Sequence, residues 1–266
     1  MSLIKSLIKF FIVRDQVLES EFPMVVNNDH IGKQILIDGY YERFYLENII
    51  NHFEPKVFEF TLMDIGANIG NHTVYFSKYF KEVLSFEPQK RTFKLLKLNC
   101  LHLPNVKLFN YGLSEKSEKV EFKIHKMNFG NAKQSQKKSN EKDYFIENVV
   151  VQPHKFHSKE VVSVIKIDVE GSESDVLSSL DNKIQSDKPI LLFEFNDLKI
   201  KNKLKHQLNK MGYNNFYVFK KELVKFKIKK VLSQNLDQLV QIDLSEEYDF
   251  SMVISFQEDS KFKLKV

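Results

Sequence analysis

The chain has 266 residues, of which 42% are hydrophobic, and this indicates a globular protein with a substantial core, most simply one domain with additions. Its formal net charge of +5 comes almost wholly from lysines interleaved with glutamates, which is typical of a solvated surface, so we expect no nucleic acid as a partner. The single cysteine, Cys100, excludes an intrachain disulfide and a thiolate metal cluster, and it agrees with a cytoplasmic location.

The first segment, residues 1–13, is apolar with Lys5 and Lys9 interspersed. It is too short to span a bilayer, and the lysines interrupt the apolar run that a signal peptide needs. The helix that its spacing predicts carries on one face the side chains of Leu3, Ile4, Leu7, Ile8 and Phe11. We expect this amphipathic helix to pack on the domain or on a sister subunit of a homodimer. The alternative is a peripheral contact with a membrane surface.

The pattern divides the chain into three parts, which are a helical N-terminal extension at 1–60, a core at 61–220 and a strand-rich C-terminal extension at 221–266. The expected core strands cover 61–65, 82–86, 106–111, 162–168 and 189–195. The expected core helices lie near 70–80, 89–102, 172–181 and 197–211. Such alternation predicts an α/β fold with a doubly wound, mostly parallel sheet. Ligands of such sheets bind beyond the carboxyl ends of the strands.

An insertion at 115–161 interrupts this alternation. Apolar and polar residues alternate at 120–124, as in an exposed strand, and a second strand-like run lies at 148–152. A polar tip rich in lysine and serine, at 133–142, separates the two runs. We interpret the insertion as a hairpin that serves either as a lid over a substrate or as a solvated loop.

The most informative motif is a glycine-rich turn at the end of the first core strand. Asp64, Gly66, Asn68 and Gly70 form the pattern D-x-G-x-N-x-G, and Glu87 ends the next strand. Glycine lets the backbone turn tightly and approach a ligand closely. A carboxylate about 20 residues further on can accept hydrogen bonds from both hydroxyls of a ribose.

The spacing of this turn also indicates the type of ligand. A dinucleotide fingerprint, G-x-G-x-x-G, needs glycines where Asn68 and Asn71 stand when the count begins at Gly66. The pattern therefore disfavours a nicotinamide dinucleotide. It suits a ligand without phosphates that carries an amino acid and a sulfonium, which is S-adenosylmethionine. An ordinary strand–helix turn is the alternative.

A polar cluster follows at the fourth core strand. Lys166, Asp168 and Glu170 have the same parity, so their side chains share one face, and Glu194 ends the neighbouring strand. Because a lysine is almost never fully buried without a partner, we expect Lys166 to pair with Asp168 or Glu194. The four residues form either a structural ion-pair cluster or a catalytic cluster in which Asp168 positions or deprotonates an acceptor hydroxyl. Two carboxylates without an identified third ligand make a weak case for Mg²⁺, and we expect no metal.

Several pieces of the chain together resemble the FkbM family of S-adenosylmethionine-dependent methyltransferases. The matching pieces are 64–70 with Thr73, 86–88, Asn99, 164–173, 176–177 and 189–194. The most specific is Lys-Ile-Asp-Val-Glu-Gly-Ser-Glu at 166–173. The resemblance implies a Rossmann-like methyltransferase fold and methyl transfer to an oxygen, often a sugar hydroxyl in surface-polysaccharide or natural-product assembly. A threonine–leucine–aspartate segment typical of the family is replaced here by Gln-Pro-His-Lys-Phe-His at 152–157.

Each donor-binding residue then has an expected role. The residues that we expect to hold the donor are Asp64, Gly66, Asn68, Gly70, Glu87, Pro88, Gly112 and Leu113. Asp64 and the glycine turn are assigned to the methionine end, and Glu87 to the ribose hydroxyls. By resemblance to the usual layout of this fold, Gly112 and Leu113 border the adenine.

Two other functions are alternatives to methylation of a small molecule or glycan. The first is a methyltransferase that acts on nucleic acid or protein. Against it, the chain has no Pro-Pro of the kind that amino-directed DNA enzymes carry, and Cys100 lies on the wrong element to be the nucleophile of a cytosine-carbon enzyme. The second is a noncatalytic scaffold that binds the adenosyl cofactor without using it.

Overall fold

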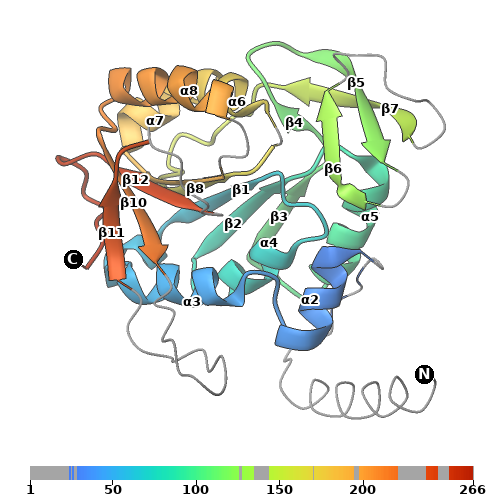
Figure 1. Ribbon diagram of the computed structural model, residues 1–266, viewed down its shortest axis with the longest axis horizontal. Coiled ribbons are helices and arrows are strands. Elements are labelled where there is room, and N and C mark those ends of the chain that lie inside the picture. The colour runs from blue at the N-terminus through green and yellow to red at the C-terminus, as the bar shows by residue number, and fades with distance from the viewer. Residues whose placement is uncertain are drawn as a thin grey trace, which may run out of the picture.

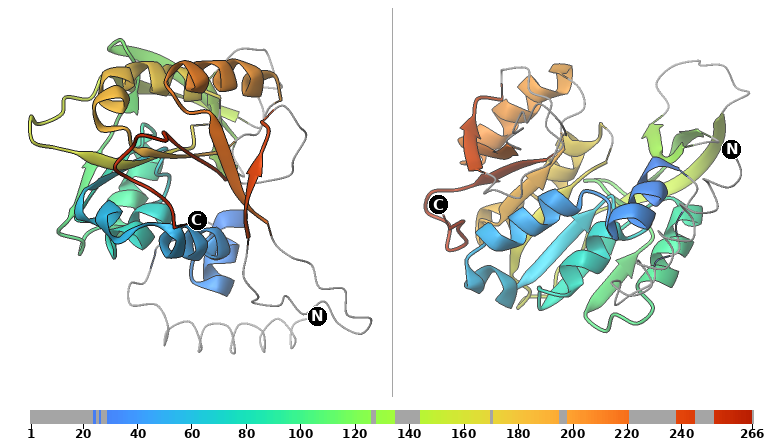
Figure 2. Two further views of the ribbon diagram at one scale, coloured as in Figure 1. Left: turned by 90° about the vertical axis from the view of Figure 1, so that its left-hand side faces the viewer. Right: turned by 60° about the horizontal axis from the view of Figure 1, so that its bottom comes forward.

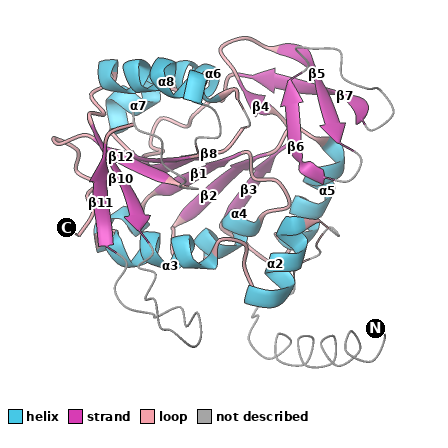
Figure 3. Ribbon diagram, viewed as in Figure 1, coloured by secondary structure: helices cyan, strands magenta, loops and turns pink. Residues whose placement is uncertain are grey.

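The computed structural model describes residues 24, 26, 29–125, 128–134, 144–169, 171–194, 198–220, 238–244 and 252–265. They build a large sheet of eight strands and a small sheet of four (Figure 1, Figure 3). The helices are α2 (His30–Asp38), α3 (Arg43–His52), η1 (Pro55–Glu59, a 3-10 helix), α4 (Asn71–Ser77), α5 (Lys90–Asn99), α6 (Glu173–Ser179), α7 (Asp181–Asp187) and α8 (Leu198–Lys210). The strands are β1 (Thr61–Ile65), β2 (Glu82–Phe86), β3 (Val106–Phe109), β4 (Gly112–Leu113), β5 (Glu118–His125), β6 (Asn128–Gln134), β7 (Tyr144–Gln152), β8 (Val162–Ile167), β9 (Ile190–Phe193), β10 (Asn215–Lys220), β11 (Gln238–Ile242) and β12 (Val253–Phe256).

The large sheet has the strand order β11-β10-β12-β9-β8-β1-β2-β3. Neighbouring strands from β9 to β3 are parallel, whereas β12 runs antiparallel to both β9 and β10, and β11 antiparallel to β10. Helices α3, α4 and α5 lie on one face of this sheet and α6, α7 and α8 on the other (Figure 1, Figure 2). The predicted α/β fold, with a doubly wound and mostly parallel sheet, is confirmed.

The central strands are buried along their whole length. Every residue of β1, β8 and β9 is buried, as expected where helices cover both faces of a parallel sheet. Two charged residues interrupt these apolar runs, Asp64 in β1 and Lys166 in β8. The two residues lie opposite each other in the pairing of β1 with β8, so both buried charges occur at one place near the carboxyl ends of these strands.

The C-terminal residues complete the large sheet from within. Strand β12 lies between β9 and β10, so the chain reaches the edge of the sheet and then returns into it. The expected extension at 221–266 therefore supplies core strands where it is described. Local alternation of apolar and polar residues predicts such strands but not their position in the sheet.

The insertion supplies β5, β6 and β7 of the small sheet, and the residues just before it supply β4, in the order β4-β7-β5-β6. Strand β5 pairs antiparallel with both β6 and β7, and β7 pairs parallel with the short β4. The expected hairpin is therefore present as β5 and β7, and the structure adds β6 and β4 to it. Most of the polar tip expected at 133–142 lies outside the described residues.

The helical N-terminal extension is described from α2 onward. Helix α2 begins at Asp29, whose carboxylate accepts the N–H of Gly32 at 2.8 Å. Helix α3 packs Leu46 and Ile49 into the core beneath the large sheet. The amphipathic helix expected at 1–13 lies outside the described residues. None of the helices that the structure describes is both long and apolar enough to cross a membrane.

Candidate active site

A cavity lies at the carboxyl ends of β1, β2, β8 and β9, where sequence analysis places the ligand. It encloses about 1140 Å³, including space that is open to solvent. The residues expected for donor or acceptor that line it are Gly66, Asn68, Glu87, Pro88, Gly112, Leu113, Asp168 and Glu194. Three expected residues do not line it, namely Asp64, Gly70 and Lys166. Glu170 lies outside the described residues.

Gly66 forms the turn that joins β1 to the cavity. Its φ of +79° lies in the left-handed region, and a Cβ at this position would lie 1.8 Å from the carbonyl oxygen of Asp168. The N–H groups of Gly66 and Ala67 both donate to the carbonyl of Phe86 at 3.0 Å. The turn is thus fixed between the ends of β2 and β8, and only glycine fits there.

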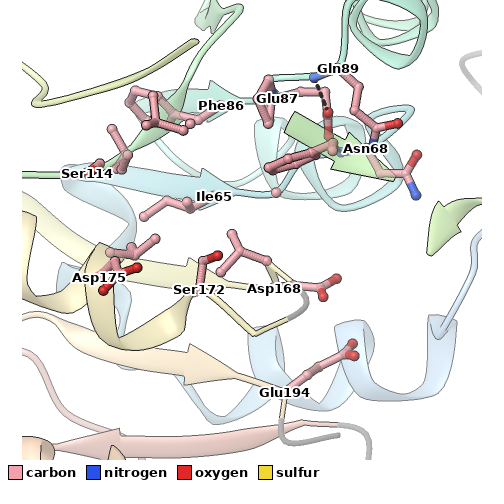
Figure 4. A pocket seen from close by; sticks show the side chains of 18 of the residues that line it. Ile65, Asn68, Phe86, Glu87, Gln89, Ser114, Asp168, Ser172, Asp175 and Glu194 are labelled. Atoms are coloured by element: carbon pink, nitrogen blue, oxygen red, sulfur yellow. Dashed lines mark hydrogen bonds between the residues drawn. The ribbon is translucent and has the colours of Figure 1, made fainter. Parts of the chain in front are cut away.

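Glu87 binds the glycine turn to the second strand. Its carboxylate accepts the N–H of Asn68 at 3.0 Å and the N–H of Gln89 at 2.8 Å, the latter drawn as a dashed line in Figure 4. The side chain is only 4% exposed, and this burial raises the pKa of Glu87 to about 7, although the two N–H groups act against the shift. Each oxygen accepts one of these N–H groups and has a second lone pair, and Glu87 lines the cavity, so the group can accept hydroxyls of a ribose.

Asp64 lies behind the glycine turn. It is completely buried, and its Oδ2 accepts the hydroxyl of Thr73 at 2.6 Å. The same hydroxyl lies 2.9 Å from that of Ser85, which extends the contact to β2. Asp64 therefore orders the residues around the turn, and its assignment to the methionine end of a donor stays a prediction.

Gly70 lies where the start of α4 packs closely against α5, and it does not line the cavity. It precedes α4 with a φ of +94°, and a Cβ there would lie 2.7 Å from the side chain of Leu96 in α5. The Asn99 amide of the same helix donates to the carbonyl of Ile69 at 2.7 Å. Both contacts hold the turn against α5, which explains the second glycine of the motif without a ligand.

Lys166 is the centre of the predicted polar cluster. Its Nζ donates to the carbonyl of Gly66 at 3.2 Å and lies 3.2 Å from Oδ1 of Asp64 and 3.4 Å from Oδ2 of Asp168. The predicted pair with Asp168 is confirmed, and Asp64 is a second partner that sequence analysis missed. Burial opposes the charge, but the carboxylates of Asp64, Asp168 and Glu194 outweigh it and raise the pKa of Lys166. One signal was available, because each of the two buried strands carries a single charged residue at the same distance from its carboxyl end.

Asp168 and Glu194 form the wall of the cavity at the ends of β8 and β9. Their backbone N–H groups continue the strand pairing, to the carbonyls of Ile65 at 3.0 Å and Ile167 at 3.4 Å. The two side chains point in the same direction, toward the side on which Asn68 lies (Figure 4). The side chain of Asp168 is 28% exposed, so it can meet a ligand while Lys166 holds it from below. Within the described ranges, no group of three or more His, Cys, Asp or Glu side chains could hold a metal ion.

The opposite wall carries the residues expected near an adenine. Gly112 and Leu113 line it, and a Cβ on Gly112 would lie 3.1 Å from Val151 of β7. Behind this wall, where the family segment is missing, His154 packs among aromatic rings and its Nδ1 lies 2.8 Å from the hydroxyl of Tyr111. Burial lowers the pKa of His154 below its ordinary value. In this replacement segment, His154 and Phe156 are partly buried behind the wall, whereas Pro153, Lys155 and His157 are exposed.

Two further walls come from segments outside the core. The insertion, for which a lid over a substrate was one of the two interpretations, contributes Glu118, Phe122 and Val151. The N-terminal segment, which was not anticipated, contributes Ile31 of α2 and Tyr41 of the turn between α2 and α3. Further lining residues are Gln89, Ser114, Ser172 and Asp175. They come from segments distant in the chain, and no local pattern predicts their meeting.

Asn71, the first residue of α4, fixes the N-terminal wall. Its Oδ1 accepts the N–H of Tyr41, and its Nδ2 donates to the carbonyl of Tyr41, both at 2.9 Å. The side chain of Asn71 thus pairs with both backbone groups of Tyr41, as a neighbouring strand would in a sheet. The position of Tyr41 at the cavity therefore depends on the same helix that follows the glycine turn.

The residues present fit an adenosyl donor with a sulfonium. Glu87 offers free lone pairs to a ribose, the turn at Gly66 admits close approach of a ligand, and Asp168 and Glu194 place negative charge nearby. Among the described lining residues there is no lysine, arginine or histidine, the side chains that ordinarily bind a pyrophosphate.

Comparison with known proteins agrees with this site. The family model of the methyltransferase FkbM domain matches residues 64–216. The protein called Methyltransferase 1 of Beauveria bassiana is 26% identical over 179 residues, which cover 58% of this chain and 68% of that protein. The hexuronic acid methyltransferase AglP of Haloferax volcanii is 34% identical over 128 residues, which cover 47% of this chain and 52% of that protein.

A solved structure shows the same kind of similarity. The crystal structure of a methyltransferase FkbM from Methylobacillus flagellatus is 14% identical, with a TM-score of 0.44, and the match covers 93% of this chain and 58% of that chain. The chain thus spans little more than half the length of AglP and of this structure. The family model covers more than half of the chain and includes both strand ends, the glycine turn and the polar cluster. The predicted resemblance is confirmed, and the chain belongs to the methyltransferase FkbM domain family.

Proposed function

We propose that the chain is an S-adenosylmethionine-dependent O-methyltransferase that methylates a sugar hydroxyl, in a small molecule or a glycan, during surface-polysaccharide or natural-product assembly. The family supports methyl transfer, and the name of AglP assigns a sugar acid to one relative. The observation that carries the proposal is Asp168, a carboxylate that lines the cavity beside the glycine turn and is held by Lys166. A cytoplasmic location is part of the proposal, supported by the buried free thiol of Cys100.

The donor side of the cavity has to bind and orient S-adenosylmethionine. When bound, S-adenosylmethionine supplies a methyl group on a sulfonium that is already electrophilic. Glu87 accepts the ribose hydroxyls, because the N–H groups of Asn68 and Gln89 fix its carboxylate and leave lone pairs free. The turn at Gly66 meets the methionine end through its backbone. Gly112 and Leu113, which line the cavity, border the adenine.

The acceptor side has to align one hydroxyl and remove its proton. Asp168 accepts the hydrogen bond of the hydroxyl and then takes its proton, in the role of a general base. Lys166 orients Asp168 through its contact at 3.4 Å. Phe122 of the insertion and Tyr41 of the N-terminal wall shield the reacting groups from water.

The test is methyl transfer from labelled S-adenosylmethionine to pools of sugars, sugar nucleotides and glycans, together with calorimetric binding of the donor. Asp168→Asn should lower transfer by about 10²–10⁴-fold and lower donor affinity much less, because the sulfonium loses only one of the negative charges near it. Asp181→Asn, an exposed residue of α7 that does not line the cavity, is the matched control and should keep full activity.

Three results contradict the proposal in different ways. Tight donor binding without transfer to any acceptor favours the noncatalytic scaffold. Label in nucleic acid or protein favours the other methyltransferase class. Full activity of Asp168→Asn removes the assigned base and leaves the family intact.

A further inference from the structure

The cavity is acidic although the protein is basic overall. Five carboxylates line it, and no described lining residue is a lysine, arginine or histidine. The five are Glu87, Glu118, Asp168, Asp175 and Glu194. Because the chain carries a formal net charge of +5, this acidity is a local arrangement and not a consequence of composition.

Lys166 lies beneath the cavity and does not neutralise it. The ammonium is shared between Asp64 at 3.2 Å and Asp168 at 3.4 Å, and the charge of Glu194 acts on it as well. One positive charge thus faces three carboxylates. Lys166 is only 1% exposed, so its ammonium is not available to an acceptor.

Asp168 and Glu194 define the side on which an acceptor binds. Glu87 and the turn at Gly66 belong to the donor side, as argued above. Asp168 and Glu194 end neighbouring strands and point the same way (Figure 4). A group on the acceptor close to its reacting hydroxyl therefore lies near two carboxylates at once.

We propose that this wall selects acceptors by charge: the enzyme takes the hydroxyl of a neutral or amino-bearing sugar and rejects a sugar with a carboxylate or phosphate beside that hydroxyl. The inference rests on the proposed sugar methylation and names its substrate class. An anion near two carboxylates is repelled, and the repulsion is strong where burial reduces screening by water. Carboxylates and phosphates are ordinarily held by Arg or Lys, and the described lining has neither. The expected acceptor thus differs in charge from the hexuronic acid in the name of AglP.

Three probes test the inference, namely the methyl glycosides of glucose, glucuronic acid and glucosamine, which at neutral pH carry no charge, a carboxylate in place of the C6 hydroxymethyl group, and an ammonium in place of the C2 hydroxyl. Binding is measured by saturation-transfer NMR on protein loaded with S-adenosylhomocysteine, and reaction by transfer of label from S-adenosylmethionine. We expect the glucoside and glucosaminide to exceed the glucuronide by about tenfold or more in kcat/KM at low salt. The ratio should shrink as salt screens the charges.

A pair of matched variants assigns the effect to the wall. Glu194→Gln removes one negative charge. It should raise the ratio of kcat/KM for the glucuronide to kcat/KM for the glucoside by about threefold to tenfold. Glu59→Gln removes the same charge from an exposed residue just before β1, at the other end of the strand, and should leave the ratio unchanged. Donor binding by both variants shows that they are folded.

The outcomes separate the inference from the proposed function. A glucuronide that binds or reacts as well as the glucoside overturns charge selection and leaves sugar methylation standing. An unchanged ratio in Glu194→Gln overturns the assignment to this wall. If none of the three glycosides binds or accepts a methyl group, sugar methylation itself is overturned, and the inference with it.

Discussion

The ammonium of Lys166 lies 3.2 Å from the carboxylate of Asp64, and both side chains are almost completely buried at paired positions of β8 and β1. Lys166 also contacts the carbonyl of Gly66 and the carboxylate of Asp168. This single lysine therefore connects the glycine turn after β1 to the carboxylate that follows β8. Removal of Lys166 leaves the buried carboxylate of Asp64 without a cationic partner among the described residues, whereas Lys166 keeps Asp168 when Asp64 is removed.

Lys166→Met should lower the free energy of unfolding by about 3–5 kcal/mol, because Asp64 loses its only cationic partner among the described residues. Denaturant unfolding measures the loss. Lys107→Met, which breaks a partly exposed pair with Glu82, is the control and should change stability by about 1 kcal/mol or less. The double variant Asp64→Leu with Lys166→Met should regain part of the loss. Equal losses in Lys166→Met and Lys107→Met would contradict the buried pair.

Gly66→Ala should weaken donor binding. The new Cβ would meet the carbonyl of Asp168 at 1.8 Å, so the turn has to move away from β8. Calorimetry with S-adenosylmethionine should show affinity lowered by about tenfold or more, with stability lowered by about 2 kcal/mol or more. Gly39→Ala is the matched control, since Gly39 has a similar φ of +80° but its Cβ would meet nothing closer than 4.0 Å. It should bind the donor normally, and a parallel loss of donor binding in both variants would show that the φ angle alone is responsible.

Glu87 should make stability and donor binding depend on pH in opposite directions. Burial raises its pKa from 4.5 to about 7, so the folded state holds the proton more tightly than the unfolded state. The free energy of unfolding should fall as pH rises through this window, by an amount on the order of 2–3 kcal/mol. Donor affinity should rise through the same window, because ribose hydroxyls donate to the ionised carboxylate.

The measurement is the difference between the native protein and Glu87→Gln, which removes the titrating group. The variant should lack both pH dependences between about pH 5 and pH 8. Glu82→Gln, at the other end of β2, should keep them. Native and Glu87→Gln profiles that run parallel would exclude Glu87 as the titrating group.

Asn71→Ala should raise KM more than it lowers kcat. The variant loses both hydrogen bonds that hold Tyr41 at the cavity, so the N-terminal wall loosens while Asp168 stays in place. Asn105→Ala is a suitable control, because Asn105 likewise makes two side-chain hydrogen bonds to the backbone, at Ser77 and Phe80, but neither of those residues lines the cavity. Both variants should lose about 1–3 kcal/mol of stability, and only Asn71→Ala should change KM. A change confined to kcat would contradict this role of the wall.

Sequence analysis located the donor turn and the polar cluster because both are encoded within a few residues. Gly66 and Glu87 follow apolar strands, and the parity of Lys166 and Asp168 fixes a shared face. The pair of Lys166 with Asp64 depends on the register of two strands separated by about a hundred residues, which no local period reports. The position of β12 inside the sheet was missed for the same reason.

The wall from the N-terminal segment was missed, and the choice between a lid and a solvated loop stayed open for the insertion, because both positions depend on contacts across the chain. Tyr41 reaches the cavity through Asn71, and Phe122 through the pairing of the small sheet. Gly70 shows the opposite error, since its motif suggested a ligand contact and its neighbours are Leu96 and Cys100. A glycine demanded by helix packing and one demanded by a ligand look alike in a sequence.

The two walls supplied by the insertion and the N-terminal helices have a consequence for how such enzymes diversify. Gly66, Glu87 and Asp168 all belong to the central sheet, whereas Phe122 and Tyr41 belong to segments attached to it. Exchange of those attached segments would reshape the space for the methylated molecule without disturbing the machinery that all such enzymes need. New substrates can then evolve at the periphery while the ancestral chemistry is inherited intact.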